Sequence, residues 1–141
     1  MDCLNEAIFA EDIELIIFRT QGNFNFLYRP RKGSTILLLH GFLENSSVWL
    51  DVEKNLNKNH RIICMDLLGH GQSGCIRYVH AIEQMAEAVY SAVLSLQVDP
   101  VLLVGNSMGG YVALAFASVY AHLVKGVYLM NSTAQADSAD K

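Results

Sequence analysis

The chain has 141 residues, enough for one domain or for part of one, and we treat residues 1–141 as a single domain. Hydrophobic residues make up 52% of the chain and charged residues 17%, which excludes a disordered chain and indicates a large buried core. The net charge of −4 excludes nucleic acid as a partner, because binding of phosphate groups requires concentrated Lys and Arg.

The N-terminal part of the sequence predicts strands. Two β-prone runs, Ile13–Arg19 and residues 24–28, are separated by Gln21-Gly22-Asn23. Glycine beside asparagine supplies the positive φ of a tight turn, which predicts a β-hairpin. Residues 35–39 form a nearly continuous apolar run, which predicts a strand buried on both faces.

The rest of the sequence predicts helices that alternate with strands. Ser46 or Ser47 is expected to cap a helix that ends near Leu56. Apolar residues recur at steps of three and four between residues 78 and 97, the pattern of an amphipathic helix. Further strands are predicted over residues 61–65, 101–104 and 126–130, and a further helix follows the turn at residues 105–110 and ends at about residue 120. We therefore expect an α/β fold, with a mostly parallel sheet of about six strands, an N-terminal β-hairpin and helices on both faces.

The strongest chemical signal is Gly105-x-Ser107-x-Gly109, between a predicted buried strand and a predicted helix. A serine in this setting occupies a sharp turn, where its backbone is strained and its hydroxyl stands clear of the sheet. Side chains at positions 105 and 109 would collide in so tight a turn, which explains the two glycines. The alternative interpretation is that Ser107 is only a helix N-cap.

A second motif, His40-Gly41-Phe42, follows the predicted strand at residues 35–39. The carboxyl ends of parallel strands lie along one edge of a sheet, where active sites form. We therefore expect the backbone N–H groups of Phe42 and Met108 to point at the same spot. Two such donors would stabilise the oxyanion that forms when a hydroxyl attacks a carbonyl.

The segment from Gly69 to Gly74 also fits the G-x-G-x-x-G pattern of dinucleotide sites. That fingerprint requires an acid at the end of the next strand, where this chain has Gly105. Asp66 would also place a negative charge beside a pyrophosphate. We predict no nucleotide and no other cofactor. We also predict no metal site, because the histidines lack the spacing of metal ligands, apart from His70 and His80, a pair ten residues apart across a loop that we attribute to chance.

Taken together, His40-Gly41-Phe42, the segment from Asp66 to Ser73 and the turn from Gly105 to Gly110 resemble the α/β-hydrolase superfamily. Within it, the chain resembles small cofactor-free esterases and the hydrolase-like lyase of menaquinone synthesis. The resemblance implies that Ser107 is the nucleophile and that the amides of Met108 and Phe42 form the oxyanion hole. It also implies structural roles at the site for His40, Gly41, Gly105, Gly109 and Asp66.

The superfamily adds an acid and then a histidine after the serine. The one histidine after Ser107 is His122, roughly 22 Å along the helix at about 1.5 Å per residue, too far to reach the serine hydroxyl. Asn131, where some members carry the acid, has no charge. We therefore expect a truncated, incomplete fold with weak activity or none. Its last strand, from Gly126 to Met130, would be an unpaired edge open to self-association.

The leading hypothesis is a serine hydrolase that acts on a small ester or similar carbonyl compound through an acyl-enzyme. Two alternatives stay open, a non-catalytic binding or assembly domain with this fold, and a C–C hydrolase or lyase that uses the same site. The N-terminus lacks the features of a signal peptide, and no apolar run is long enough to cross a membrane. We expect a soluble cytoplasmic protein with no membrane partner.

Overall fold

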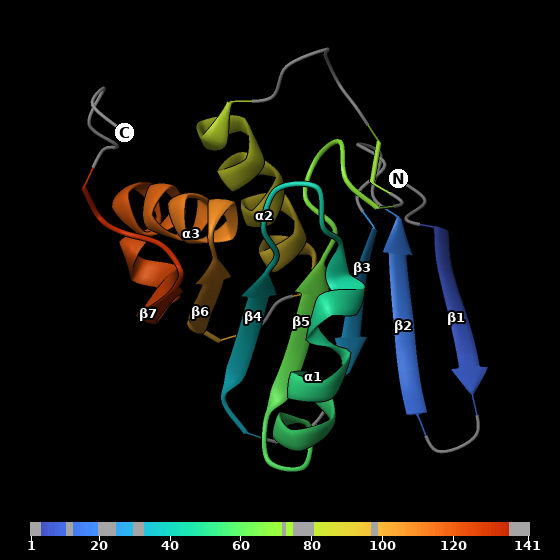
Figure 1. Ribbon diagram of the computed structural model, residues 1–141. Coiled ribbons are helices and arrows are strands. Elements are labelled where there is room, and N and C mark those ends of the chain that lie inside the picture. Colours follow the sequence, from blue (N-terminus) through green and yellow to red (C-terminus); the bar gives the residue numbers. More distant parts are fainter. Residues whose placement is uncertain are drawn as a thin grey trace.

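The computed structural model describes residues 4–10, 13–19, 25–29, 33–71, 73–74, 81–96 and 99–135, with the backbone alone for residues 4–29. The described strands form one seven-stranded sheet in the order β1-β2-β3-β5-β4-β6-β7 (Figure 1). Helices pack on both of its faces, as the sequence predicts. The fold is therefore an α/β fold whose sheet has one antiparallel and one parallel half.

The antiparallel half consists of β1 (Leu4–Ala10), β2 (Ile13–Arg19) and β3 (Asn25–Arg29). β2 and β3 pair in antiparallel register, which confirms the predicted hairpin, although its turn lies outside the described residues. β1 is missing from the sequence prediction, because alanine, asparagine and glutamate are poor strand formers. It is a strand because it pairs with β2 along its whole length, so the sheet has seven strands instead of about six.

The parallel half consists of four strands, of which β4 (Thr35–Leu39) lies between β5 (Arg61–Met65) and β6 (Val101–Asn106). β4 pairs in parallel with both neighbours, and β7 (Val124–Met130) pairs in parallel with β6. β3 joins the two halves by pairing antiparallel to β5. The predicted fold class is thereby confirmed.

Every residue of β4 is buried, because helices cover the strand on both sides. Successive side chains of a strand point to opposite faces. Ile36 and Leu38 therefore pack with Trp49 on one face, and Leu37 and Leu39 belong to the larger core on the other. This explains why the sequence of β4 is continuously apolar instead of alternating.

The first face is covered by a short 3-10 turn, η1 (Ser46–Trp49), and the helix α1 (Leu50–Leu56) that continues from it. The prediction that Ser46 or Ser47 caps this segment is wrong by one residue. Asn45 has the extended backbone of an N-cap, and its side chain accepts a hydrogen bond of 2.9 Å from the N–H of Ser47.

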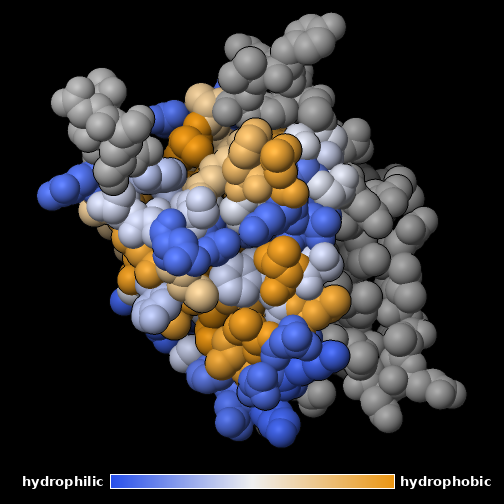
Figure 2. All heavy atoms as spheres, in the orientation of Figure 1, coloured by the Kyte–Doolittle hydropathy of each residue, from blue (hydrophilic) through white to orange (hydrophobic). Residues whose placement is uncertain are grey.

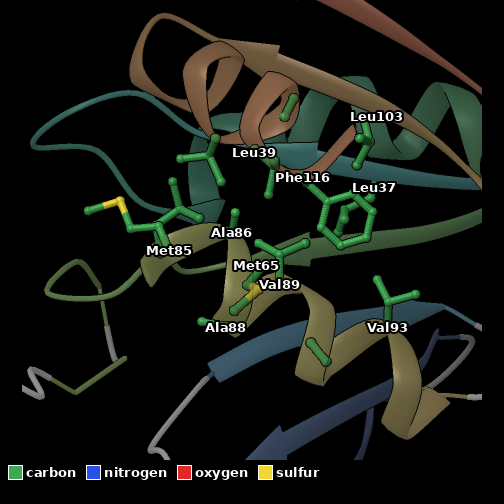
Figure 3. Close-up of a cluster of buried hydrophobic side chains, with 14 of the residues drawn as sticks. Leu37, Leu39, Met65, Met85, Ala86, Ala88, Val89, Val93, Leu103 and Phe116 are labelled. Atoms are coloured by element: carbon green, nitrogen blue, oxygen red, sulfur yellow. The ribbon is translucent and has the colours of Figure 1, made fainter. Parts of the chain in front are cut away.

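The opposite face is covered by α2 (Ile82–Leu96) and α3 (Met108–Val119), followed by the 3-10 turn η2 (Ala121–Leu123). Of the helix predicted for residues 78–97, residues 78–80 and 97 lie outside the described residues, and residues 82–96 are helical as predicted. The two helices and the sheet enclose the main core (Figure 3). Its buried members include Leu37, Leu39, Met65, Met85, Ala86, Val89, Val93, Leu103, Val112, Ala113 and Phe116.

β7 is an edge strand of the sheet, since its one neighbour among the described strands is β6. Tyr128 is 61% exposed and Met130 is 37% exposed on this strand. Self-association through this edge stays a prediction.

None of the helices in the described segments combines the length and apolar character that a bilayer crossing requires.

Candidate active site

The site lies where the strand order brings three loops together. β5, β4 and β6 are adjacent and parallel, so the loops that leave their carboxyl ends emerge along one edge of the sheet. Figure 1 shows the segments after β4 and β5 and the start of α3 at this upper edge. Residues distant in sequence thus approach one another here, as expected for an open α/β sheet.

Ser107 occupies the turn between β6 and α3. Its φ of 52° and ψ of −116° lie outside the regions that ordinary residues favour. Its N–H donates a hydrogen bond of 2.8 Å to the carbonyl of Met130, and its own carbonyl accepts one of 2.9 Å from the N–H of Gly110. These bonds hold a strained backbone in place, as is common where a reactive residue must be presented.

The side chain of Ser107 is exposed and makes no capping hydrogen bond to α3, although the residue occupies the N-cap position. A serine that served only as a cap would accept a bond from the first turn of the helix. The geometry therefore argues against the interpretation of Ser107 as a helix cap alone.

The two glycines of the motif allow this turn to pack against β4. A side chain at Gly105 would collide with the backbone of Gly109 and Gly110. One at Gly109 would collide with the carbonyl groups of Leu39 and His40 at the end of β4. The start of α3 thus lies directly against the loop that carries Phe42.

The backbone amides of Phe42 and Met108 make no hydrogen bond to any other described residue. Met108 is the first residue of α3, so its N–H is one of the unsatisfied donors at the positive end of the helix dipole. Phe42 lies in a tight turn that the N–H of Glu44 closes on the carbonyl of Gly41 at 3.2 Å. Both amides are therefore available to an acceptor.

Non-glycine residues with positive φ gather at this edge of the sheet. In the described residues they are Leu43 at 60°, Ser107 at 52° and Asn131 at 49°. Leu43 lies in the turn after β4, and the other two directly follow β6 and β7. Strained backbone of this kind clusters at functional sites, which makes this edge the candidate active site.

His40 is fully buried and joins the loops after β4 and β5. Its Nε2 accepts a hydrogen bond of 2.9 Å from the N–H of Leu67, so the proton of the neutral ring is on Nδ1, which donates to the carbonyl of Gly41 at 2.8 Å. Both ring nitrogens are thus occupied, as expected for a residue that holds loops and not for a catalytic base.

Burial lowers the pKa of His40 below its ordinary value of 6.5. The hydrogen bond to Gly41 and the charges of Asp66 and Glu44 act in the opposite direction, and His70 adds to the lowering. The ring is therefore held in its neutral form, in which Nε2 can accept the bond from Leu67.

Asp66 orders the loop that follows β5. Its Oδ1 accepts a hydrogen bond of 2.7 Å from the N–H of Ser46, and its carbonyl accepts one from the hydroxyl of Ser73. Gly71 has a φ of 54° and lies so close to the Asp66 carboxylate that a side chain would collide with it. The glycine-rich segment thus packs on an acid, an arrangement unfavourable for a pyrophosphate.

The sequence does not predict the hydrogen bonds that connect three polar residues at this edge, Glu44, Asn106 and Asn131. Oε2 of Glu44 accepts a hydrogen bond of 2.9 Å from the N–H of Gly41 and lies 3.4 Å from Nδ2 of Asn106. Oδ1 of Asn106 accepts one of 3.0 Å from Nδ2 of Asn131. Glu44 lies in the loop after β4, Asn106 ends β6 and Asn131 follows β7, so no local sequence pattern links the three residues.

Of the other histidines, His70 lies at this edge, with its ring centroid 5.2 Å from that of His40 and 5.7 Å from that of Phe42, and its Nδ1 binds the carbonyl of Leu68 at 3.0 Å. His122 is in η2, after the far end of α3, in agreement with the expected separation from Ser107. His80 is not among the described residues. Where the structure describes the chain, no group of three or more His, Cys, Asp and Glu side chains is placed to hold a metal ion.

Two large apolar residues are exposed beside the site. Phe42 is 66% accessible to solvent and Leu43 is 81% accessible. Val48 and Leu50 on the following segment are about half exposed. Figure 2 shows such hydrophobic residues scattered among hydrophilic ones on the face that carries α1.

We predict that Gly109→Ala destabilises the chain by about 2 kcal/mol, since overpacking against backbone outweighs the roughly 1 kcal/mol that alanine gains in a helix. Gly126→Ala is the matched control. There the added carbon meets only the flexible end of Leu102, at 3.2 Å. Urea unfolding followed by circular dichroism measures the free energy of unfolding of the two variants and the wild type. Equal stability of the two variants would contradict the close approach of α3 to β4.

The lowered pKa of His40 predicts a pH-dependent stability. The unfolded chain protonates this histidine more readily than the folded chain does. The contribution of neutral His40 to the free energy of unfolding is therefore complete above about pH 6.5 and is lost as the pH falls through the lower folded-state pKa. The stability of His40→Gln should fall less between pH 7.5 and 5 than that of the wild type. His122→Gln, at an exposed position, is the control and should keep the wild-type dependence. Identical pH profiles for all three proteins would refute this role of His40.

Comparison with known proteins agrees with the architecture. Residues 34–141 match the family described as "alpha/beta hydrolase fold". A thermophilic esterase from Thermogutta terrifontis superposes on 99% of this chain and 48% of its own, with a TM-score of 0.76 and 30% identity. A marine microorganism esterase superposes on 76% of this chain and 41% of its own, with a TM-score of 0.72 and 24% identity, and it supports the fold alone.

Among curated proteins, an uncharacterized protein of Mycobacterium tuberculosis is 34% identical over 116 residues, which are 82% of this chain and 34% of that protein. Human monoacylglycerol lipase ABHD6 is 36% identical over 110 residues, which are 76% of this chain and 33% of the lipase. The chain spans about a third of the length of these relatives. The match of the family model to residues 34–141, together with the observed fold, shows that this chain belongs to the α/β-hydrolase fold family.

Proposed function

We propose that this chain contributes the nucleophile and the oxyanion hole of a serine hydrolase that cleaves ester bonds through an acyl-enzyme. The observation that carries the proposal is the exposed Ser107 in its strained turn, and two amides, those of Phe42 and Met108, that have no acceptor among the described residues support it. A nucleophile needs access to substrate and a fixed position, and this turn provides both.

In the proposed reaction, the Ser107 hydroxyl attacks the carbonyl carbon of the ester, and the carbonyl oxygen becomes an oxyanion. The N–H groups of Phe42 and Met108 bind that oxyanion. Loss of one such donor typically lowers kcat by about 10²–10³-fold, so the pair is a major part of the rate enhancement. The alcohol leaves with a proton, and water then attacks the acyl-enzyme to release the acid.

The serine hydroxyl needs a base to accept its proton. Both ring nitrogens of His40 are engaged in hydrogen bonds. His70 binds the carbonyl of Leu68 through Nδ1, and its Nε2 is buried. His122 lies beyond the far end of α3. We therefore propose that the base and its acid come from residues beyond Lys141 or from a second chain. Without them, this chain by itself would turn over slowly or not at all.

The substrate we propose is an ester with an apolar acyl group. Phe42 and Leu43 expose large apolar surfaces next to the amide that would bind the oxyanion. The similarity to a monoacylglycerol lipase and to esterases supports the same class of substrate.

A cytoplasmic location, and self-association through the edge strand β7, stay predictions.

The proposal is tested with a fluorophosphonate probe, which phosphonylates an activated serine, on the full-length protein. We expect Ser107 to carry the label, as read by peptide mass spectrometry, and Ser107→Ala to lose it along with roughly 10³-fold or more of the esterase activity. Ser118→Ala is the control and should be labelled normally, because Ser118 is an exposed serine further along α3. Absence of label from the wild type, or label retained in Ser107→Ala, would refute the proposal.

A further inference from the structure

The side chain of Glu44 connects the two loops that carry the proposed oxyanion-hole amides. One of its oxygens, Oε2, accepts the hydrogen bond from the N–H of Gly41 at 2.9 Å and lies 3.4 Å from Nδ2 of Asn106. Gly41 directly precedes Phe42, and Asn106 directly precedes Ser107. A single carboxylate oxygen thus joins two segments that are 62 residues apart in sequence.

The direction of this small network follows from chemistry. An ionised carboxylate can only accept hydrogen bonds, so Asn106 must turn its NH₂ group toward Glu44. Its Oδ1 then accepts from Asn131, at 3.0 Å, and Asn131 directly follows β7. The network therefore runs across the ends of β4, β6 and β7 in one consistent orientation.

The turn that Glu44 closes is strained and needs such support. Leu43 has a φ of 60° at the third position of the turn, where glycine or asparagine is usual. The backbone N–H of Glu44 binds the Gly41 carbonyl, and its side chain binds the Gly41 N–H, so both polar groups of Gly41 are bound. The Gly41 carbonyl, which shares a peptide with the Phe42 N–H, also accepts a hydrogen bond of 2.8 Å from Nδ1 of His40. The side chain of Glu44 holds the preceding peptide through the Gly41 N–H, so His40 and Glu44 together fix the backbone that leads to the Phe42 N–H.

The space around Gly41 shows how tightly the parts fit. A side-chain carbon at position 41 would lie 3.1 Å from Oε2 of Glu44 and 3.4 Å from Nδ2 of Asn106. The glycine therefore allows the two loops to meet at the carboxylate.

We propose that Glu44 is a positioning residue that holds the amides of Phe42 and Met108 in a common geometry for the oxyanion. This inference rests on the proposed function, and it adds a residue that contacts neither the substrate nor the serine hydroxyl. Because a displacement of about 1 Å can cost 10²-fold in rate, loss of the Glu44 side chain should lower kcat while leaving ground-state binding nearly intact.

The Gly41 N–H and the Nδ2 of Asn106 both donate to Oε2 of Glu44, so two substitutions of Glu44 can separate the role of its position from the role of its charge. In Glu44→Gln the amide oxygen can occupy the position of Oε2 and accept from both Gly41 and Asn106. In Glu44→Asp the charge is kept, but the side chain is one methylene too short to reach both. A positioning role therefore predicts activity in the glutamine variant and loss in the aspartate variant, whereas a role based on charge predicts the reverse.

The experiment uses the full-length protein and measures kcat and KM for a p-nitrophenyl ester, and inhibition by a trifluoromethyl ketone that forms a tetrahedral adduct with the serine. For Glu44→Ala and Glu44→Asp we expect kcat to be about 10- to 100-fold lower than in the wild type and KM to stay within about 3-fold of the wild-type value. The inhibition constant of the ketone should rise by the same factor by which kcat falls. Glu44→Gln should stay within about 3-fold of the wild type. Glu87→Ala, which removes an exposed glutamate of α2, is the matched control and should behave as the wild type.

If Glu44→Ala does not fold, the comparison of Glu44→Gln with Glu44→Asp, together with Asn106→Ala, decides the question. Asn106→Ala should show the same loss of kcat, and its effect should not add to that of Glu44→Asp. Kinetics of Glu44→Asp equal to those of Glu87→Ala, or an inactive Glu44→Gln, would overturn the inference. A wild type without Ser107-dependent hydrolysis would instead overturn the proposed function, so the two failures are distinguishable.

Discussion

The structure of the site depends on the close approach of backbone to backbone between the start of α3 and the end of β4. Gly109 lies against the carbonyls of Leu39 and His40, at a distance that no side chain permits. This contact brings the turn of Ser107 beside the turn of Phe42, although the two are remote in sequence. The parallel pairing of β4 with β6 sets the same alignment, so the sheet and the glycines act together.

Much of this arrangement was predictable from sequence because the residues involved have few structural alternatives. An apolar run such as residues 35–39 has to be covered on both faces, and the structure covers it with α1 on one side and α2 and α3 on the other. Glycines that flank a serine between strand and helix indicate a sharp turn, and Ser107 has the corresponding positive φ. Local sequence therefore specified the elements and the turn of the nucleophile candidate.

The parts that escaped prediction depend on contacts between distant segments. β1 has a composition unfavourable for a strand, and it is one because β2 offers a partner along its full length. Glu44, Asn106 and Asn131 are polar residues at or after the ends of three different strands, and their network exists only after the sheet has aligned those strand ends. Choosing Asn45 over two serines as the cap required backbone geometry that the sequence does not display.

The proposed active site requires that the amides of residues 42 and 108 face a common point beside the Ser107 hydroxyl. A crystal structure of the protein phosphonylated on Ser107 tests this most directly, since the phosphonyl oxygen occupies the place of the oxyanion. We expect this oxygen to lie about 2.7–3.1 Å from both amide nitrogens. An oxygen that is directed to solvent, or that contacts only one of the two amides, would contradict it.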